Sequence, residues 1–452
     1  MKFVSTRGNS SPLCFSEAVM EGLAPDGGLY VPEEFPNLKN YFDSWEKLSY
    51  SELCFEFFKV FTPEIPEENL KEIVFKSYKT FDKESVAELK KLSDKLYVLE
   101  LFHGPTLAFK DFALQLLGNL YEYLLAKENA SINVLGATSG DTGSAAINGL
   151  LGKKGVNIFI LYPDKRVSPL QERQMTCTGA DNVFPIAITG TFDDAQAIVK
   201  ELFGDLSFKK EFKLSAVNSI NLARILAQCV YYIYAWLQFP KDKRANIEFV
   251  VPTGNFGNVL AGWMAYKMGM EVAGFKVATN RNDILFKLFN SGVYELGEVS
   301  SSHAPSMDIQ VSSNFERFIY YLENKDTNKV CEIMSSFAKN KKYVFEKFVK
   351  SNFRASRMDD SEIEKTIESV FEKYNYIVDP HTACAFADLD DKKINVVLST
   401  AHAAKFPDLI ESLLKEIPVA ESLEVLKQKE IKRVMLPANL ADVKEYIITN
   451  GI

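Results

Sequence analysis

The sequence predicts an α/β protein in which parallel sheets are covered by helices. Short runs rich in Val, Ile and Leu recur along the chain and alternate with longer segments whose apolar residues are three and four positions apart. Runs that are apolar on both faces are typical of parallel strands buried beneath helices. The chain has 452 residues, more than one hydrophobic core usually spans, so we expect at least two packed units.

The alternation of strands and helices begins after residue 94. The predicted strands are 96–102, 132–137, 156–163, 182–189, 247–253, 274–280 and 394–401. The helices predicted between them are 111–126, 143–152, 168–179, 193–203 and 257–269, and the apolar run 225–239 is predicted to be a buried helix. We therefore divide the chain into a mixed, mainly helical N-terminal domain (1–94), a first α/β unit (95–240) and a second α/β unit (241–452) with a helical insertion at 315–375.

Composition and charge exclude several classes of function. The formal net charge is −8 with no basic block, which argues against nucleic acid as the main ligand. No apolar run is long enough to span a membrane, and the first residues lack the apolar core of a signal peptide. The six cysteines lie far apart, and the four histidines show no metal-ligand spacing, so we expect reduced thiols, no metal and a cytoplasmic protein.

Two glycine-rich segments follow predicted strands. They are "GATSGDTGSAA" at 136–146 and "PTGNFGNVLAG" at 252–262. Glycines after a strand let the backbone come close to a ligand, and the N–H groups of the next helix can bind an anion. Neither segment matches a known nucleotide-binding signature. Each segment taken alone is equally well explained as a tight strand-to-helix turn.

Lys110 lies between Phe109 and Phe112 in the segment "GPTLAFKDFALQ". Taken singly, it is best explained as a lysine whose ammonium group reaches water. In combination with two anion-binding loops it indicates a lysine that forms an imine with a cofactor, because partial burial makes the amine reactive. Imines between lysine and a phosphorylated cofactor are typical of pyridoxal phosphate chemistry.

With these motifs in view, the sequence resembles the threonine synthase family, in its longer form, over nearly the whole chain. "FSEAVMEGLAPDGGLYVP", "GPTLAFKDFALQ", "ATSGDTGSAA", "VNSINLAR", "GNFGN" and "STAHAAKFP" carry the resemblance. It implies the fold of the tryptophan synthase β type, with pyridoxal 5′-phosphate as cofactor. The implied reaction, the last step of threonine biosynthesis, is a β,γ-elimination and replacement that converts O-phospho-L-homoserine and water into L-threonine and phosphate.

The resemblance also implies roles for individual residues. Lys110 would be the catalytic residue and the covalent attachment point of the cofactor. The other implied cofactor-binding residues are Asp141 near the ring hydroxyl, Gly254, Asn255, Phe256, Gly257 and Asn258 around the phosphate, and Thr400 at the ring nitrogen. The implied substrate-binding residues are Thr138, Ser139 and Thr142 for the carboxylate, and Asn218, Ser219 and Arg224 for the phosphate.

Two positions depart from the family pattern. Ser312 and Ala403 stand where the family commonly has proline. Because proline fixes φ, we expect these replacements to affect only local rigidity.

Alternative functions remain open at this point. Arg224 could merely cap a helix through a salt bridge, in which case a lyase acting on serine or an activated serine would fit equally well. A catalytically silent relative that only binds the cofactor or a phosphorylated ligand is a third reading, although the presence of Lys110 argues against it. The number of subunits is open between a monomer and a homo-oligomer.

Overall fold

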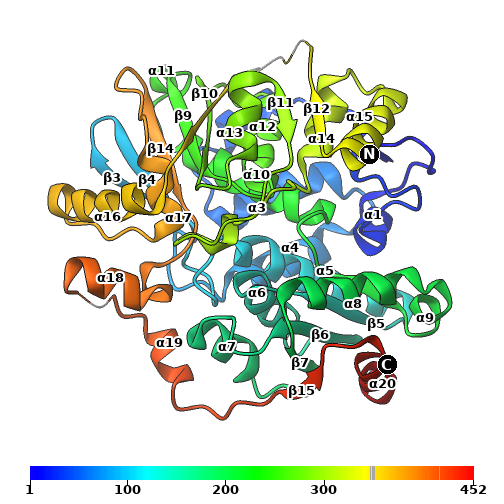
Figure 1. Ribbon diagram of the computed structural model, residues 1–452. Helices are drawn as coiled ribbons and strands as arrows, with labels where there is room; N and C mark the ends of the chain where they lie inside the picture. The colour runs from blue at the N-terminus through cyan, green and yellow to red at the C-terminus, as the bar shows by residue number, and fades with distance from the viewer. Residues whose placement is uncertain (347, 349–351, 417) are drawn as a thin grey trace.

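The computed structural model describes residues 1–346, 348, 352–416 and 418–452. Figure 1 shows two groups of strands, one in the upper and one in the lower half of the view, with helices around and between them. The upper group is a six-stranded sheet and the lower group a five-stranded sheet. The N-terminus lies at the right of the view, whereas α3 (Tyr50–Phe61) and α4 (Glu67–Tyr78) are labelled near its centre.

The five-stranded sheet is parallel throughout. Its order is β15-β7-β6-β5-β8. The strands are β5 (Ile132–Ala137), β6 (Val156–Pro163), β7 (Val183–Thr189), β8 (Leu214–Ala216) and β15 (Val434–Pro437). The helices along this part of the chain are α5 (Lys110–Glu128), α6 (Asp141–Leu150), α7 (Pro169–Thr176), α8 (Phe192–Gly204), α9 (Leu206–Glu211) and α20 (Leu440–Asn450).

The six-stranded sheet has the order β13-β10-β9-β14-β4-β3 and is parallel except for β3 at its edge. The strands are β3 (Glu88–Ser93), β4 (Leu96–Glu100), β9 (Ile247–Pro252), β10 (Gly274–Thr279), β13 (Phe353–Arg357) and β14 (Ile394–Ser399). Helices along this part of the chain include α12 (Gly257–Lys267), α13 (Ile284–Ser291), α16 (Asp360–Tyr374) and α18 (Pro407–Leu414). The predicted α/β class with helix-covered parallel sheets is confirmed.

The N-terminal segment combines a short antiparallel pair with helices. The pair is β1 (Phe3–Ser5) and β2 (Tyr30–Pro32), and the helices are α1 (Phe15–Glu21), α2 (Lys39–Trp45), α3 (Tyr50–Phe61) and α4 (Glu67–Tyr78). Helix α3 begins with a capping box, in which the Ser49 hydroxyl and the Glu52 carboxylate each accept a hydrogen bond from the other residue's backbone N–H. The capping box explains why a polar serine immediately precedes a strongly apolar helix.

The sheets exchange strands across the predicted domain boundaries. Strand β4 belongs to the six-stranded sheet although it falls in the predicted first unit, and β15 from the predicted second unit joins the five-stranded sheet. The boundaries near 94 and 240 therefore remain a prediction. The predicted insertion 315–375 contains α14 (Phe315–Leu322), α15 (Thr327–Asn340) and α16, but it also supplies the edge strand β13. An edge strand is buried on fewer sides, which weakens its apolar pattern.

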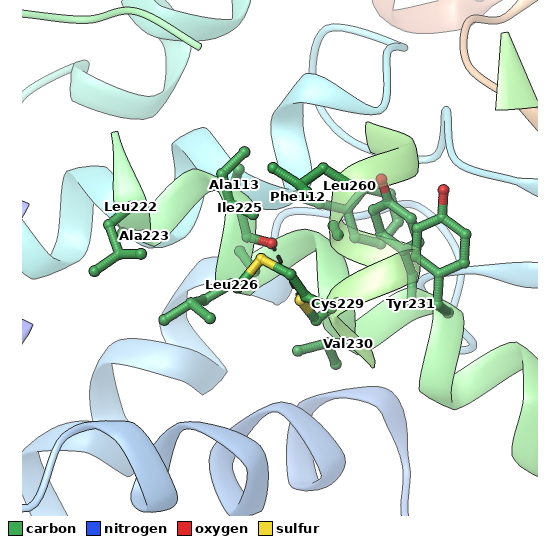
Figure 2. Close-up of a cluster of buried hydrophobic side chains, with 14 of the residues drawn as sticks. Phe112, Ala113, Leu222, Ala223, Ile225, Leu226, Cys229, Val230, Tyr231 and Leu260 are labelled. Atoms are coloured by element: carbon green, nitrogen blue, oxygen red, sulfur yellow. Dashed lines mark hydrogen bonds between the residues drawn. The ribbon is translucent and has the colours of Figure 1, made fainter. Parts of the chain in front are cut away.

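Helix α10 (Leu222–Leu237) is buried along almost its whole length, as predicted for the run 225–239. Figure 2 shows Phe112 and Ala113 of α5 next to Ile225 and Cys229 of α10, with Leu260 of α12 in the same cluster. Packing of this kind fixes the starts of three helices relative to one another. In the part of the chain that the structure describes, no helix is both long and apolar enough to cross a membrane.

Helices α5 and α6 approach each other closely at Gly118 and Gly149. A Cβ atom placed on Gly118 would overlap the carbonyl oxygen of Gly149, and one placed on Gly149 would overlap the carbonyl oxygen of Leu114. The two helices begin at Lys110 and Asp141. Their close packing therefore sets the distance between two residues that the sequence predicts to be functional.

We predict that Gly118→Ala destabilises the protein by about 1–3 kcal/mol, because the added methyl group forces the two helices apart. The matched control is Gly204→Ala in α8, where the new methyl group meets no atom within 4 Å. That substitution is expected to be neutral or to stabilise the protein by about 0.5–1 kcal/mol, because alanine loses less entropy in a helix. Urea denaturation of both variants measures the difference, and equal stabilities would refute the packing argument.

Candidate active site

A cavity lies where strands β9 and β14 give way to the segments that follow them. Open parallel sheets commonly bind ligands at such carboxyl ends. Segments far apart in the sequence supply its walls. Of the predicted site residues, those that line the cavity are Lys110, Asp141, Thr142, Ser219, Arg224, Gly254, Asn255, Phe256, Gly257, Asn258 and Thr400. The cavity lining does not include Thr138, Ser139 or Asn218.

Lys110 is the first residue of α5, and its side chain is 11% exposed. Its Nζ lies 3.5 Å from Oδ2 of Asp141 and 5.3 Å from the centre of the Phe109 ring. Burial lowers the pKa of Lys110; Asp141 opposes this change, whereas the positive charges of Lys405 and Arg224 reinforce it. A lower pKa leaves more of the amine neutral at a given pH, and a neutral amine is a nucleophile and a base.

The aspartate after Lys110 has a structural task. The Asp111 carboxylate accepts hydrogen bonds from the backbone N–H of Thr106 at 2.8 Å and from its hydroxyl at 2.7 Å. Burial raises the pKa of Asp111 to about 6, although these hydrogen bonds lower it in part. The carboxylate therefore holds the turn that leads into α5. In this way it fixes the position of Lys110, the first residue of that helix.

Asp141 is the acidic residue of the described cavity lining, and several side chains contact its carboxylate. It is the first residue of α6, and its carboxylate accepts hydrogen bonds from Gln171 Nε2 at 3.0 Å and Ser306 Oγ at 2.9 Å. Nζ of Lys405 lies 2.7 Å from its Oδ1 atom. Burial alone would raise the pKa of Asp141, but the ammonium groups of Lys405 and Lys110 outweigh burial and hold the pKa well below its usual range. Asp141 is therefore an anion at neutral pH.

Three residues of this cluster are not among the predicted site residues. Lys405 and Ser306 contact Asp141, and His381 lines the cavity beside them. Nε2 of His381 accepts a hydrogen bond from the backbone N–H of Ser306 at 3.1 Å, so Nδ1 carries the proton and donates to Asp379 at 2.8 Å. The only sequence signal for Lys405 was its place five residues after Thr400 in the segment "STAHAAKFP".

Thr400 follows β14 and is held through its backbone. Its carbonyl accepts a hydrogen bond from the N–H of Phe109 at 2.9 Å, and its own N–H donates to the Thr382 hydroxyl at 3.2 Å. The Thr400 hydroxyl makes no hydrogen bond to any described residue. The side chain therefore remains available to a ligand in the cavity.

The loop 254–258 connects β9 to α12 and turns its backbone toward the cavity. Phe256 has the left-handed φ of +61°, and its fully buried ring packs against Phe315 and Phe318, each with the ring centre 5.4 Å away. The Phe256 side chain thus anchors the loop from behind. The N–H groups at the start of α12 are the donors that such a loop offers to an anion.

Ser312 strengthens this loop although it stands in place of a family proline. Its hydroxyl donates a hydrogen bond of 2.6 Å to the carbonyl of Gly254, and the N–H of Asn314 donates to the carbonyl of Asn255 at 3.1 Å. Proline has no hydroxyl for the first contact.

Ala403, the second position at which the family commonly has proline, begins a short 3-10 helix, η3 (Ala403–Lys405). Nδ1 of His402 accepts a hydrogen bond of 3.1 Å from the N–H of Ala404 and so closes the first turn of this helix.

Three donor atoms beside the cavity are buried without a partner in the described structure. They are Nε and Nη1 of Arg224 and Nδ2 of Asn258. Arg224 is only 4% exposed, and burial lowers its pKa to about 10, so it is still a cation at neutral pH. The Asn258 amide is oriented because its oxygen accepts from the hydroxyls of Tyr231 at 2.6 Å and Tyr232 at 2.8 Å. Buried unpaired donors are costly, so these atoms indicate anionic ligands.

The three predicted residues outside the cavity lining differ in their surroundings. The Thr138 hydroxyl accepts hydrogen bonds from the backbone N–H groups of Gly140 at 3.0 Å and Gly143 at 2.9 Å, so it shapes the loop before α6. Ser139 lines a neighbouring cavity next to α7. The Asn218 amide oxygen accepts from the N–H of Ile220 at 3.2 Å and so fixes the turn before α10.

The residues around the cavity fit pyridoxal phosphate. The group needs an amine for its aldehyde and an anion site for its phosphate. Lys110 supplies a buried amine with a lowered pKa, and the 254–258 loop with the unpaired amide of Asn258 supplies the anion site. No part of the described cavity lining argues against this cofactor.

Comparisons with known proteins agree with this geometry. Three family models match: the threonine synthase N terminus at residues 2–78, the pyridoxal-phosphate dependent enzymes at 84–397 and the threonine synthase C-terminal region at 381–447. Threonine synthase of Saccharomyces cerevisiae is 45% identical over 91% of this chain and 88% of its own, and that of Pseudomonas aeruginosa is 42% identical over 100% and 99%.

A crystal structure of pyridoxal-phosphate-bound threonine synthase from Brucella melitensis superposes with a TM-score of 0.97. It is 41% identical, and the match covers 100% of this chain and 99% of that one. Identity at this level over full-length chains, together with a cavity that fits the cofactor, settles the assignment. The chain belongs to the threonine synthase family of pyridoxal-phosphate-dependent enzymes.

Proposed function

We propose that this enzyme converts O-phospho-L-homoserine and water into L-threonine and phosphate in the cavity around Lys110. The observation that carries the choice of substrate is Arg224, a buried cation with two unpaired donors in the same cavity as a buried amine. A substrate without a phosphate group would leave this cation unpaired. A buried guanidinium with free donors therefore fits a phosphorylated amino acid better than it fits serine.

The proposal assigns the cofactor to one side of the cavity. Lys110 would hold pyridoxal phosphate covalently, the loop 254–258 would bind its phosphate, Asp141 would lie near its ring hydroxyl, and Thr400 would contact the ring nitrogen. When bound, the cofactor takes up the electrons released as protons leave the substrate carbons. Thr400 is a neutral partner and does not stabilise a positive ring nitrogen as a carboxylate would. This arrangement favours elimination and replacement over transamination.

Lys110 would move the protons. It stands at the start of a rigid helix, so its amine is tethered within reach of the bound substrate. Because burial and its cationic neighbours favour the neutral amine, Lys110 can accept a proton, and as an ammonium group it can return the proton to the next carbon. One group can therefore serve successive steps.

The remaining predicted residues would bind the two charged ends of the substrate. Arg224 and Ser219 line the cavity and would receive the phosphate, with Asn218 fixing the turn between them and the strand before. Thr142 and Ser139 would bind the carboxylate at the start of α6, where helix N–H groups favour a negative charge. Thr138 would act through the shape of this loop, because its hydroxyl already accepts two backbone N–H groups.

We also propose that the protein works in the cytoplasm as a monomer or a homo-oligomer. All six cysteines lie in described segments and are free of disulfide bonds, which supports a reducing compartment. The two alternatives from the sequence remain testable. A lyase acting on serine would make no use of Arg224, and a silent relative would bind the cofactor without releasing phosphate.

The first test concerns the lysine. Lys110→Ala is expected to abolish the visible absorption band of the bound cofactor, because Lys110 is the only lysine among the described residues that line the cavity. Borohydride reduction followed by peptide mapping of the wild-type protein should locate the cofactor on Lys110. The control is Lys153→Ala, since burial also lowers the pKa of Lys153 but the residue lies outside the cavity lining. Labelling of a lysine other than Lys110 would overturn the assignment.

The second test decides between substrates. Arg224→Leu is expected to lower kcat/KM for O-phospho-L-homoserine by about 10- to 150-fold, because a hydrogen bond to a charged group contributes roughly 1.5–3 kcal/mol. Deamination of serine, followed as a side reaction, should change little. Both reactions are measured in the same buffer without inorganic phosphate, which would compete for the site.

A matched variant controls for the loss of a buried arginine. Arg244 is 6% exposed, but its guanidinium is paired with Glu46 and with the carbonyls of Leu237 and Phe239, outside the cavity. Arg244→Leu should leave the ratio of the two reactions unchanged. If Arg224→Leu impairs both reactions equally, the residue supports the helix rather than the phosphate.

A further inference from the structure

We propose that Lys405 is a positioning residue, whose ammonium group neutralises Asp141 and so leaves Lys110 as the free, reactive amine of the cavity. This inference rests on the proposed function and deepens it, because it names the group that prepares Lys110. No motif assigned a role to Lys405. Its contacts within the described structure carry the argument.

Lys405 is buried and held in one place. It ends the 3-10 helix η3, is 3% exposed, and donates a hydrogen bond of 2.9 Å to the carbonyl of Thr106. Its Nζ lies 2.7 Å from Oδ1 of Asp141. A buried ammonium group is stable only with a close anion and further acceptors, and these two contacts supply both. Lys405 is therefore a fixed positive charge.

Asp141 is shared unequally between the two lysines. Oδ1 of Asp141 receives Lys405 at 2.7 Å and the amide of Gln171 at 3.0 Å. Oδ2 receives the Ser306 hydroxyl at 2.9 Å, and Lys110 is more distant, at 3.5 Å. The carboxylate is thus already neutralised and hydrogen-bonded without Lys110. Lys110 therefore makes the longer of the two lysine contacts, although Asp141 is still the strongest charge that acts on it and raises its pKa.

More cations than anions act on Lys110. Lys110 faces Asp141 of α6, Lys405 of η3 and Arg224 of α10, that is, one anion and two cations. Asp141 also faces His381 of α17 (Pro380–Ala383), and Lys405 also faces Asp111 of α5. A second positive charge near an amine favours its neutral form. Lys405 therefore acts on Lys110 twice, directly and by occupying Asp141.

A purely structural role is the competing explanation. The contact with Thr106 ties η3 to the turn before α5, so loss of Lys405 could simply loosen that turn. The two explanations differ in one observable. Only the electrostatic role predicts a change in the pH at which Lys110 loses its proton in a protein that is still folded.

The test measures the amine itself. The full-length protein is freed of cofactor, and the rate of Lys110 acetylation by acetic anhydride is followed from pH 6 to 11 by mass spectrometry of the peptide. Lys405→Met should raise the midpoint of this profile by about one to two pH units and slow acetylation at pH 7.5 at least about tenfold. Lys405→Arg keeps the charge and should retain a profile close to that of the wild type.

Two further variants keep the proposal falsifiable if Lys405→Met does not fold. Asp141→Asn removes the anion between two cations, so the midpoint for Lys110 should move in the opposite direction, to lower pH. Lys276→Met is the matched control, because Lys276 is a fully buried lysine that also donates to a backbone carbonyl but lies outside the cavity lining. Its loss should leave the Lys110 profile unchanged.

The outcomes separate this inference from the proposed function. An unchanged Lys110 profile in folded Lys405→Met, or a shift to higher pH in Asp141→Asn, would overturn the role of Lys405. An equal shift in Lys276→Met would show that any buried lysine has this effect, and would overturn it as well. Because acetylation needs neither cofactor nor substrate, the expected shifts would stand even if the wild-type enzyme formed no threonine, a result that would refute only the reaction.

Discussion

The buried carboxylate of Asp141 is the interaction on which the cavity depends. It brings together groups from four separate parts of the chain: Lys110 from α5, Gln171 from α7, Ser306 from the segment before α14, and Lys405 from η3. Without it, the buried ammonium group of Lys405 would lose the carboxylate that lies 2.7 Å from its Nζ. The carboxylate can occupy this place only because α5 and α6 pack closely through Gly118 and Gly149, so backbone packing and electrostatics are linked at this point.

Two other residues of the cavity follow a different principle. There the protein keeps donors unpaired: the guanidinium of Arg224 and the amide of Asn258 are buried and have no partner in the described structure. The tyrosine hydroxyls that hold the Asn258 oxygen, and the core packing of Phe256, prevent the amide and its loop from turning away. The folded protein therefore tolerates the unfavourable free energy of burying unpaired donors, and a bound anion removes this cost. A preorganised site of this kind loses little entropy when its ligand arrives.

The sequence predicted what is local and missed what depends on tertiary pairing. Buried strands such as β5 and β6 are continuous apolar runs, and the lysine motif and glycine-rich loops are contiguous, so all were visible. The edge strands β8, β13 and β15 are short and partly exposed, and their apolar pattern is weak. Nothing in the local sequence distinguishes Lys405 from other lysines, because the carboxylate that pairs with it, Asp141, lies 264 residues away in the chain. Likewise, no local pattern could show that the ring of Phe256 points into the core while its backbone faces the cavity.

The charges of the cavity explain why it combines a lysine that is neutralised by a carboxylate with an arginine that is left unpaired. Lys110, Asp141 and Arg224 line the cavity, and Lys405 pairs with Asp141 beside it, so Arg224 is a positive charge that no carboxylate in the lining is left to balance. Two phosphate groups, one on the cofactor and one on the proposed substrate, would more than restore the balance. Because Asp141 already neutralises Lys405, the positive charge that remains belongs to Arg224, whose Nε and Nη1 have no partner in the described structure. An incoming dianion is then drawn to Arg224, while Lys110 keeps the neutral amine that proton transfer requires. Neutralising one lysine with a buried carboxylate thus separates phosphate binding from proton transfer within a single cavity.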